Sequence, residues 1–218
     1  MSTLESILQK YNMPMADRIE IPNVGRDTLA ALLHELDFKI GVEIGVQRGK
    51  FSEVICRFNP QMKVYGVDPW AEYITHPSEK HEKSTQNHSS QAKLEEFHQE
   101  TVKRLSPYPG YEIIREYSID ALKHFEDESI DFVYIDANHE YSFVMEDIEE
   151  WHKKVKKGGI VSGHDYYGIR DPRSSMHVKP AVDDFVRDNG IKPLIIWGTK
   201  GALPGEIRDR RRSWSWVK

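Results

Sequence analysis

The chain has 218 residues, of which 39% are hydrophobic and 30% are charged, and its formal net charge is −5. This length suffices for one domain with a full core and short additions. The negative charge argues against a general affinity for the nucleic acid backbone, because that affinity depends on an excess of Lys and Arg. A local basic run, Arg208–Arg212, is more typical of a solvated surface than of a phosphate or anion site.

Cysteine usage and hydropathy narrow the class of protein further. The single cysteine, Cys56, excludes an intrachain disulfide, and its apolar helical surroundings predict a small core residue rather than a nucleophile. The first residues lack the continuous apolar stretch of a signal peptide, and no later stretch reaches transmembrane length. We therefore expect a soluble, cytoplasmic protein with no membrane partner. Its oligomeric state, a homo-oligomer included, stays open.

The chain begins with helical patterns and then alternates between two kinds of element. Ser2–Glu5 resembles a capping box that opens a short helix, and leucines at helical spacing predict a second helix over Arg26–Leu36. Six apolar runs that follow are typical of strands: Ile40–Ile44, Lys63–Val67, Tyr111–Ile114, Ile130–Ile135, Gly159–Ser162 and Pro193–Trp197. The helical patterns between them are Lys50–Phe58, Gln91–Leu105, Ile119–His124, Ser142–Val155 and Pro180–Asp188.

This order of elements predicts the fold class. Nearly continuous apolar strands separated by helices indicate a parallel sheet that is covered on both faces. The alternation in Arg212–Lys218 predicts a further strand with one buried face. We expect an α/β fold with a doubly wound, mostly parallel, seven-stranded Rossmann-like sheet, helices on both faces and an antiparallel C-terminal strand. The N-terminal helices of residues 1–36 would pack on a domain of residues 37–218.

One segment, residues 71–91, departs from this scheme. It holds three histidines, His76, His81 and His88, among polar residues without clear periodicity. A long irregular insert in a compact domain is usually either a functional lid or disordered, and both readings stay open. The irregular spacing of the histidines does not by itself make a metal site.

The segment Gly41–Val54 combines a strand, a glycine turn and the start of a helix. Glycines let a ligand approach the main chain, and the helix start offers free N–H groups, so a nucleotide site is indicated. The dinucleotide fingerprint G-x-G-x-x-G fails, because Glu43 stands at its first glycine, and a Walker A loop fails because only three residues separate Gly45 from Gly49. In the remaining pattern, E-x-G-x-x-x-G, the carboxylate of Glu43 stands at the end of the strand and points into the crevice. A carboxylate there suits an amine rather than a phosphate.

Two residues after the next strand complete this half of the site. Asp68, in the run VYGVDPW, follows the second of the alternating strands, where an acidic residue can accept hydrogen bonds from ribose hydroxyls. Trp70 either shields an adenine or closes the substrate pocket, or it is a core residue.

These motifs resemble the class I S-adenosylmethionine-dependent methyltransferases. The resemblance runs from about Arg26 to the end of the chain. It implies that Gly45 and Gly49 lie against the methionyl part of the cofactor, that Asp68 holds the ribose and that the turn at Ser118 faces adenine. The cofactor-binding residues that it implies are Glu43, Gly45, Val46, Gly49, Asp68, Trp70, Ser118 and Asp136.

Four chemically active side chains follow the strands Ile130–Ile135 and Gly159–Ser162, namely Asp136, His139, His164 and Asp165. In an open α/β sheet, ligands bind beyond the carboxyl ends of the strands. This set suits O-methylation, because an alcohol needs a base to take its proton and a divalent cation can lower its pKa. His139 would be the base, although it could instead bond the backbone at a helix start, just as Asp136 could cap that helix.

The segments IDANHEY and GHDYYG are similar to the branch of this superfamily that includes macrocin-type sugar O-methyltransferases and cephalosporin-hydroxylase-like proteins. The resemblance implies His139 and Asp136 as catalytic residues and Asp136, His164 and Asp165 as metal ligands. Because His164 stands where an acidic ligand is common, the site would favour Mn²⁺, bind Mg²⁺ weakly, or hold no metal. The polar acceptor wall would comprise Tyr166, Tyr167, Gly168, Arg170, Arg173 and His177.

The sequence therefore predicts a methyltransferase that uses S-adenosylmethionine, with or without Mg or Mn, to O-methylate a hydroxyl of a small-molecule, sugar or natural-product acceptor. Two alternatives stay open. A metal-dependent hydrolase or oxygenase would use Asp136, His164 and Asp165 but would leave the glycine turn and Asp68 without a role. A non-catalytic binding module on the same fold would not depend on His139.

Overall fold

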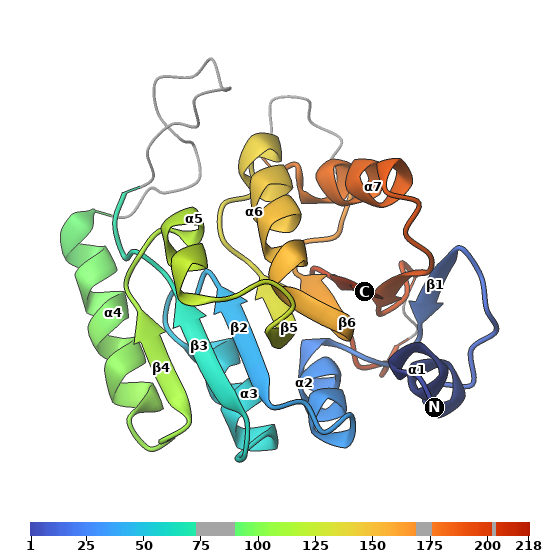
Figure 1. Ribbon diagram of the computed structural model, residues 1–218, viewed down its shortest axis with the longest axis horizontal. Coiled ribbons are helices and arrows are strands. Elements are labelled where there is room, and N and C mark those ends of the chain that lie inside the picture. Colours follow the sequence, from blue (N-terminus) through green and yellow to red (C-terminus); the bar gives the residue numbers. More distant parts are fainter. Residues whose placement is uncertain (73–89, 169–175, 202–203) are drawn as a thin grey trace.

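The computed structural model describes residues 1–72, 90–168, 176–201 and 204–218. The described residues form one eight-stranded sheet with the order β1-β7-β8-β6-β5-β2-β3-β4 (Figure 1). The strands are β1 (Arg18–Ile21), β2 (Ile40–Ile44), β3 (Lys63–Val67), β4 (Tyr111–Ile114), β5 (Ile130–Ile135), β6 (Val155–Gly163), β7 (Leu194–Trp197) and β8 (Ser213–Val217). The helices are α1 (Thr3–Lys10), α2 (Arg26–Glu35), α3 (Lys50–Phe58), α4 (Gln91–Leu105), α5 (Ser118–Ala121), the 3₁₀ helix η1 (Leu122–His124), α6 (Tyr141–Lys154) and α7 (Val178–Asp188).

The predicted α/β fold with a mostly parallel sheet and an antiparallel C-terminal strand is confirmed, since β8 alone among these strands runs antiparallel to its neighbours, β6 and β7. The predicted count of seven strands is wrong. The eighth is β1, which pairs in parallel with β7 and places Ile19 opposite Ile195. It lies within residues 1–36, for which the sequence predicts only helices, and its four residues are too few to form a clear apolar run. The division at residue 37 stays a prediction.

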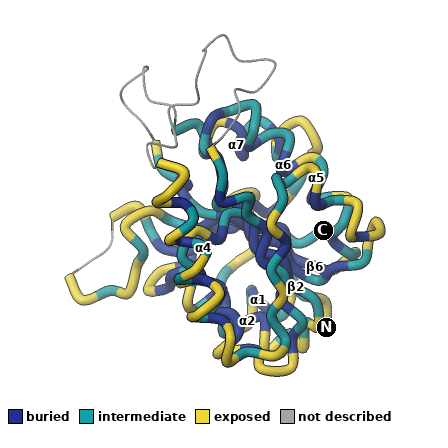
Figure 2. Tube along the Cα trace, turned by 90° about the vertical axis from the view of Figure 1, so that its left-hand side faces the viewer, coloured by how far each residue is buried: buried dark blue, intermediate teal, exposed yellow. Residues whose placement is uncertain are grey.

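The two faces of the sheet are covered by different helices, as the side chains of β5 illustrate. Val133 and Ile135 belong to a buried cluster with α6 and α7, whereas Phe132 and Tyr134 belong to one with α1, α2 and α3. This alternation follows from the two-residue period of a strand, and both faces are apolar because both are covered. Figure 2 shows the buried segments gathered in the middle of the molecule, with exposed residues at its periphery.

Several predictions concern residues outside the described ranges. They include most of the insert at 71–91, with His76, His81 and His88, and part of the expected acceptor wall, with Arg170 and Arg173. Within the described ranges, each helix is too short or too polar to cross a membrane. The predicted burial of Cys56 is confirmed.

Candidate active site

The site lies where the chain order of the sheet reverses. The strands β2 and β5 are adjacent, with β3 on one side and β6 on the other, so four parallel strands end at one edge. Gly45, Asp68, Asp136 and His164 each follow one of these strands directly. Such a switch point is where open α/β sheets bind ligands. A cavity of about 510 Å³ opens there, lined by Arg26, Glu43, Gly45, Val46, Gln47, Arg48, Lys50, Phe51, Asp68, Trp70, Ala71, Leu94, Phe97, Asp136, Ala137, His139, His164 and Asp165.

The turn after β2 depends on glycine. Gly45 has φ +88°, and a Cβ placed on it would lie 2.2 Å from the carbonyl oxygen of Asp136. Gly49 has φ +67° and directly precedes α3. Both conformations are in the left-handed region, which strongly favours glycine. Gly45 and Val46 line the cavity as predicted, whereas Gly49 shapes the turn without being part of the described lining.

Asp68 organises this turn through backbone hydrogen bonds. Its carboxylate accepts from the N–H of Gln47 at 2.9 Å and from the N–H of Trp70 at 2.8 Å. The indole N–H of Trp70 donates to the carbonyl of Gln47 at 2.7 Å, and the ring is 1% exposed. Trp70 is therefore buried, as expected of a core residue, and it also lines the cavity. Its contact with an adenine or a substrate stays a prediction. Burial raises the pKa of Asp68, and the backbone hydrogen bonds partly offset this effect.

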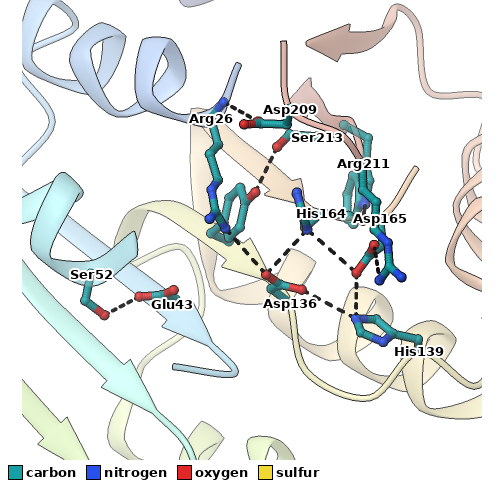
Figure 3. Close-up of polar contacts among 12 residues, drawn as sticks. Arg26, Glu43, Ser52, Asp136, His139, His164, Asp165, Asp209, Arg211 and Ser213 are labelled. Carbon is teal, nitrogen blue, oxygen red and sulfur yellow. Dashed lines mark hydrogen bonds and ion pairs between the residues drawn. The ribbon is translucent and has the colours of Figure 1, made fainter. Parts of the chain in front are cut away.

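Glu43 lies in the cavity lining and is 2% exposed. Its carboxylate accepts a hydrogen bond from the Ser52 hydroxyl, at the start of α3 (Figure 3). Burial raises the pKa of Glu43 to about 8, and the negative charge of Asp136 adds to this effect. A ligand ammonium placed here would favour the ionised carboxylate.

Ser118, expected to face an adenine ring, is not part of the described cavity lining. Its hydroxyl accepts from the indole N–H of Trp151 at 2.7 Å. Ser118 also bonds the buried carboxyl of Asp147, whose pKa burial raises to about 7. Ser118 therefore connects the start of α5 to α6, and its contact with a cofactor stays a prediction.

In the same cavity wall, four predicted residues come together in a charged cluster (Figure 3). The Nε2 atom of His139 lies 2.9 Å from Asp165 Oδ2 and 3.4 Å from Asp136 Oδ1. The Nδ1 atom of His164 lies 3.6 Å from one oxygen of each of these carboxylates. The prediction that adjacent strand ends would bring these side chains together agrees with this geometry.

Local backbone contacts set the direction of these side chains. The Asn138 side chain accepts from the N–H of Glu140 at 2.9 Å, just before α6 begins, and the carbonyl of His139 accepts from the N–H of His177 at 2.7 Å. Asp165 has φ +59°, an uncommon conformation that aspartate tolerates better than most residues. The segment IDANH therefore leaves the strand in a tight turn that returns the imidazole toward Asp136.

Two arginines that the sequence analysis did not assign to the site complete the cluster. The guanidinium of Arg26, at the start of α2, lies 4.0 Å from Asp136 Oδ2, and its backbone N–H donates to Asp209 at 2.7 Å. The Nη1 atom of Arg211 lies 3.1 Å from Asp165 Oδ1. No local motif marks Arg26, and the basic run that contains Arg211 is more typical of a solvated surface, so neither contact is predictable from local sequence.

These contacts change the protonation of the cluster. Although burial disfavours its charge, hydrogen bonds to Asp136 and Asp165 raise the pKa of His139 to about 9. Against the effect of burial, hydrogen bonds from His139 and His164 hold the pKa of Asp165 well below its usual range. In this arrangement His139 is an imidazolium at neutral pH, and it must lose that proton before it can act as a base.

The same atoms are suited to a cation. Ligand atoms of Asp136, His139 and Asp165 all lie within 4.8 Å of one another. The sequence analysis instead placed His164 with the two aspartates, and its Nδ1 is at 3.6 Å from each. Two carboxylates and an imidazole form a donor set that suits Mn²⁺ or a similar divalent metal better than Mg²⁺, which prefers oxygen alone.

Comparison with known proteins assigns the family. A sequence profile described as a methyltransferase domain matches residues 42–166. An uncharacterized protein, R132, of Acanthamoeba polyphaga mimivirus is 29% identical over 147 residues, which cover 67% of this chain and 59% of that protein. The chain thus spans less than two thirds of the length of this relative.

Solved structures agree at the level of the fold. The O-methyltransferase TomG from Streptomyces achromogenes, in complex with SAM, superposes with a TM-score of 0.59 at 16% identity and covers 99% of this chain and 89% of TomG. The O-methyltransferase from Bacillus cereus, in complex with SAH, gives 0.58 at 16% identity, with 99% and 90% covered. An rRNA methylase from Streptococcus thermophilus gives 0.54 at 17% identity, with 88% and 93% covered.

The matched region contains both the glycine turn at Gly45 and the charged cluster through Asp165. The predicted resemblance to class I methyltransferases is confirmed. Since the profile spans more than half of the chain, this protein belongs to the methyltransferase-domain family.

Proposed function

We propose that this protein transfers the methyl group of S-adenosylmethionine to a hydroxyl group of a small-molecule acceptor, such as a sugar or natural product. The observation that carries the proposal is the position of His139 between Asp136 and Asp165, in the wall of the same cavity that begins at the Gly45 turn. Two of the similar solved structures contain SAM or SAH, which supports this cofactor.

The described residues fit this cofactor. At Gly45 the turn passes so close to the backbone of Asp136 that only a residue without a side chain fits, and Gly45 and Val46 line the cavity. Glu43 and Asp136 offer carboxylates to an ammonium or a sulfonium, and Asp68 offers carboxylate oxygens to ribose hydroxyls. Leu94 and Phe97 of α4 add an apolar wall next to Trp70.

The charged cluster would supply the proton transfer. A methyl group moves in line from sulfur to oxygen, so the residues contribute mainly by positioning the acceptor and accepting its proton. His139 can accept this proton only when its ring is neutral. A divalent cation on Asp136 and Asp165 would lower the pKa of an acceptor hydroxyl and offset the two charges that hold the proton on His139. His164 would be the nitrogen ligand of such a cation, which would leave His139 available as the base.

The test combines binding with turnover. We expect S-adenosylhomocysteine to bind to the purified protein in calorimetry, and we expect His139→Gln to bind it equally well. The same variant should lose about 10²- to 10⁴-fold in methyl transfer across a panel of hydroxylated acceptors, the range typical of a lost general base. His34→Gln, on an exposed position of α2, is the matched control. Absence of S-adenosylhomocysteine binding would refute the proposal.

Metal dependence is tested in the same assay. With a chelator present, methyl transfer should rise with pH toward about 9, where His139 loses its proton. Added Mn²⁺ should move this rise to lower pH, because a cation on the carboxylates disfavours the imidazolium. An unchanged profile would exclude the metal from this role. The hydrolase or oxygenase alternative gains no support from the comparisons.

A further inference from the structure

The basic segment Arg208–Arg212 lies directly before β8 and contains four arginines, which differ in their contacts. Arg208 donates from Nη1 to the carbonyls of Thr199 and Lys200, both at 2.8 Å. Arg212 pairs with Glu20 of β1 at 2.9 Å. These two arginines hold the segment against β1 and against residues 199–200, so their role is structural.

Arg211 has a different environment. Its Nη1 atom contacts Asp165, whose side chain is 3% exposed, whereas the side chain of Arg211 is 46% exposed. This contact uses one of the five N–H donors of a guanidinium. The guanidinium also lies over the ring of Tyr167, 5.1 Å from its centroid. Arg211 therefore connects the cavity wall at Asp165 to the solvent.

Arg210 adds a second positive charge at the same place. It is exposed, and the charges of Arg210 and Arg211 both act on the phenol of Tyr167. Arg211 uses one N–H donor on Asp165, and its side chain stays largely exposed. The exposed guanidinium groups of Arg210 and Arg211 would therefore stabilise a further anion here.

We propose that the methyl acceptor carries an anionic group, a carboxylate or a phosphate, which Arg211 binds with Arg210. This inference rests on the proposed function and names the class of its acceptor. A guanidinium presents paired donors that match both anions. Arg211 contacts Asp165 and Asp165 contacts His139, so an anion on Arg211 would place a nearby hydroxyl of the same molecule toward His139. The negative charge of the acceptor would then determine which molecule binds. The charged cluster would accept the proton of its hydroxyl during methyl transfer.

Calorimetry on the protein saturated with S-adenosylhomocysteine tests this inference. The probes are glucose 6-phosphate, glucuronate and inorganic phosphate, with glucose as the neutral control. We expect at least one sugar anion to bind about tenfold more tightly than glucose, because charge-assisted hydrogen bonds are the stronger kind. Inorganic phosphate separates binding of the anion alone from binding of the sugar that carries it.

Variants locate the site of binding. Arg211→Gln should lower the affinity for the sugar anion about tenfold. Arg210→Gln, which leaves the Asp165 contact intact, should lower it about threefold. Neither should change the affinity for S-adenosylhomocysteine. Arg187→Gln removes an equal charge from the exposed part of α7 and should have no effect. If Arg211→Gln does not fold, Arg210→Gln decides the test.

Three results would overturn the inference: glucose binding as tightly as the anions, anion binding that both variants leave unchanged, or no anion binding at millimolar concentration. Each of them leaves the proposed function intact when S-adenosylhomocysteine binds. Absence of S-adenosylhomocysteine binding would instead overturn the proposed function and this inference together.

Discussion

The glycine turn and the charged cluster, which meet where Gly45 approaches the backbone of Asp136, are held by different interactions. At the turn, a single carboxylate, Asp68, accepts two backbone N–H groups, and the Trp70 indole donates to a backbone carbonyl. At the cluster, Asp136 and Asp165 contact histidines and arginines. The turn is fixed mainly by the backbone, whereas the shape of the cluster depends on charge. A cation bound at the cluster should therefore alter the contacts of its side chains and leave the backbone hydrogen bonds of the turn in place.

The largest expected effect concerns the turn. Gly45→Ala would place a Cβ 2.2 Å from the carbonyl of Asp136 at φ +88°. Because backbone must move to relieve this contact, we expect a loss of about 3 kcal/mol in the free energy of unfolding. Loss of S-adenosylhomocysteine binding should accompany it.

Denaturation and calorimetry at a single pH measure both effects of Gly45→Ala. Gly201→Ala is the control, since an added Cβ there meets no atom of the described residues within 4 Å. Normal S-adenosylhomocysteine binding by Gly45→Ala would show that the turn does not form the cofactor site.

The next effect is pH-dependent and concerns the cluster. Against the cost of burial, hydrogen bonds to Asp136 and Asp165 raise the folded-state pKa of His139 from 6.5 to about 9. A raised histidine pKa stabilises the folded state fully below pH 6.5, and this contribution is lost as the pH rises through 9. His139→Gln should therefore cost about 2 kcal/mol more at pH 6 than at pH 10.

Urea denaturation of wild type and His139→Gln at these two pH values measures that difference. The exposed His34→Gln variant controls for loss of a histidine elsewhere. An equal loss of unfolding free energy at both pH values would mean that the two carboxylates do not hold a proton on His139. The contrast between the glycine turn and the charged cluster would then be lost.

The smallest effect concerns the connection between α2 and the basic segment. Asp209→Ala removes the acceptor of the Arg26 N–H at the start of α2, and loss of such a contact typically costs about 1 kcal/mol. Arg26 lines the cavity, so a modest loss of S-adenosylhomocysteine affinity should follow. Asp188→Ala, at an exposed surface ion pair of α7, should change little. Equal stability of the two variants would show that Asp209 does not support α2.

Local patterns in the sequence predict the turn better than the cluster. The residues that shape the turn, from Glu43 to Trp70, lie close together in the chain and carry glycine and strand patterns that can be read directly. Asp136 and Asp165 are also predictable, because parallel strands deliver their ends to one edge. The positions of Arg26 and Arg211 at the site are not predictable from local sequence, since tertiary packing of α2 and β8 brings them there.

Local sequence patterns have the same limit when they are used to predict the fold. Long apolar runs such as Ile130–Ile135 predict strands with accurate bounds. By contrast, β1 has only Ile19 and Ile21 as buried residues and depends on pairing with β7. Ser118 follows β4 as expected, but its hydroxyl bonds Trp151, a contact that no local pattern reveals.

The antiparallel direction of β8 has a consequence for how the site is assembled. Its first residues pair with the last residues of β6, with Trp214 opposite Gly163, and this brings the preceding arginines to the edge where the parallel strands end. Until β8 inserts between β6 and β7, Asp165 lacks its guanidinium partner and α2 lacks its contact with Asp209. A chain with the other strands paired and β8 still unpaired would therefore lack a finished reaction centre.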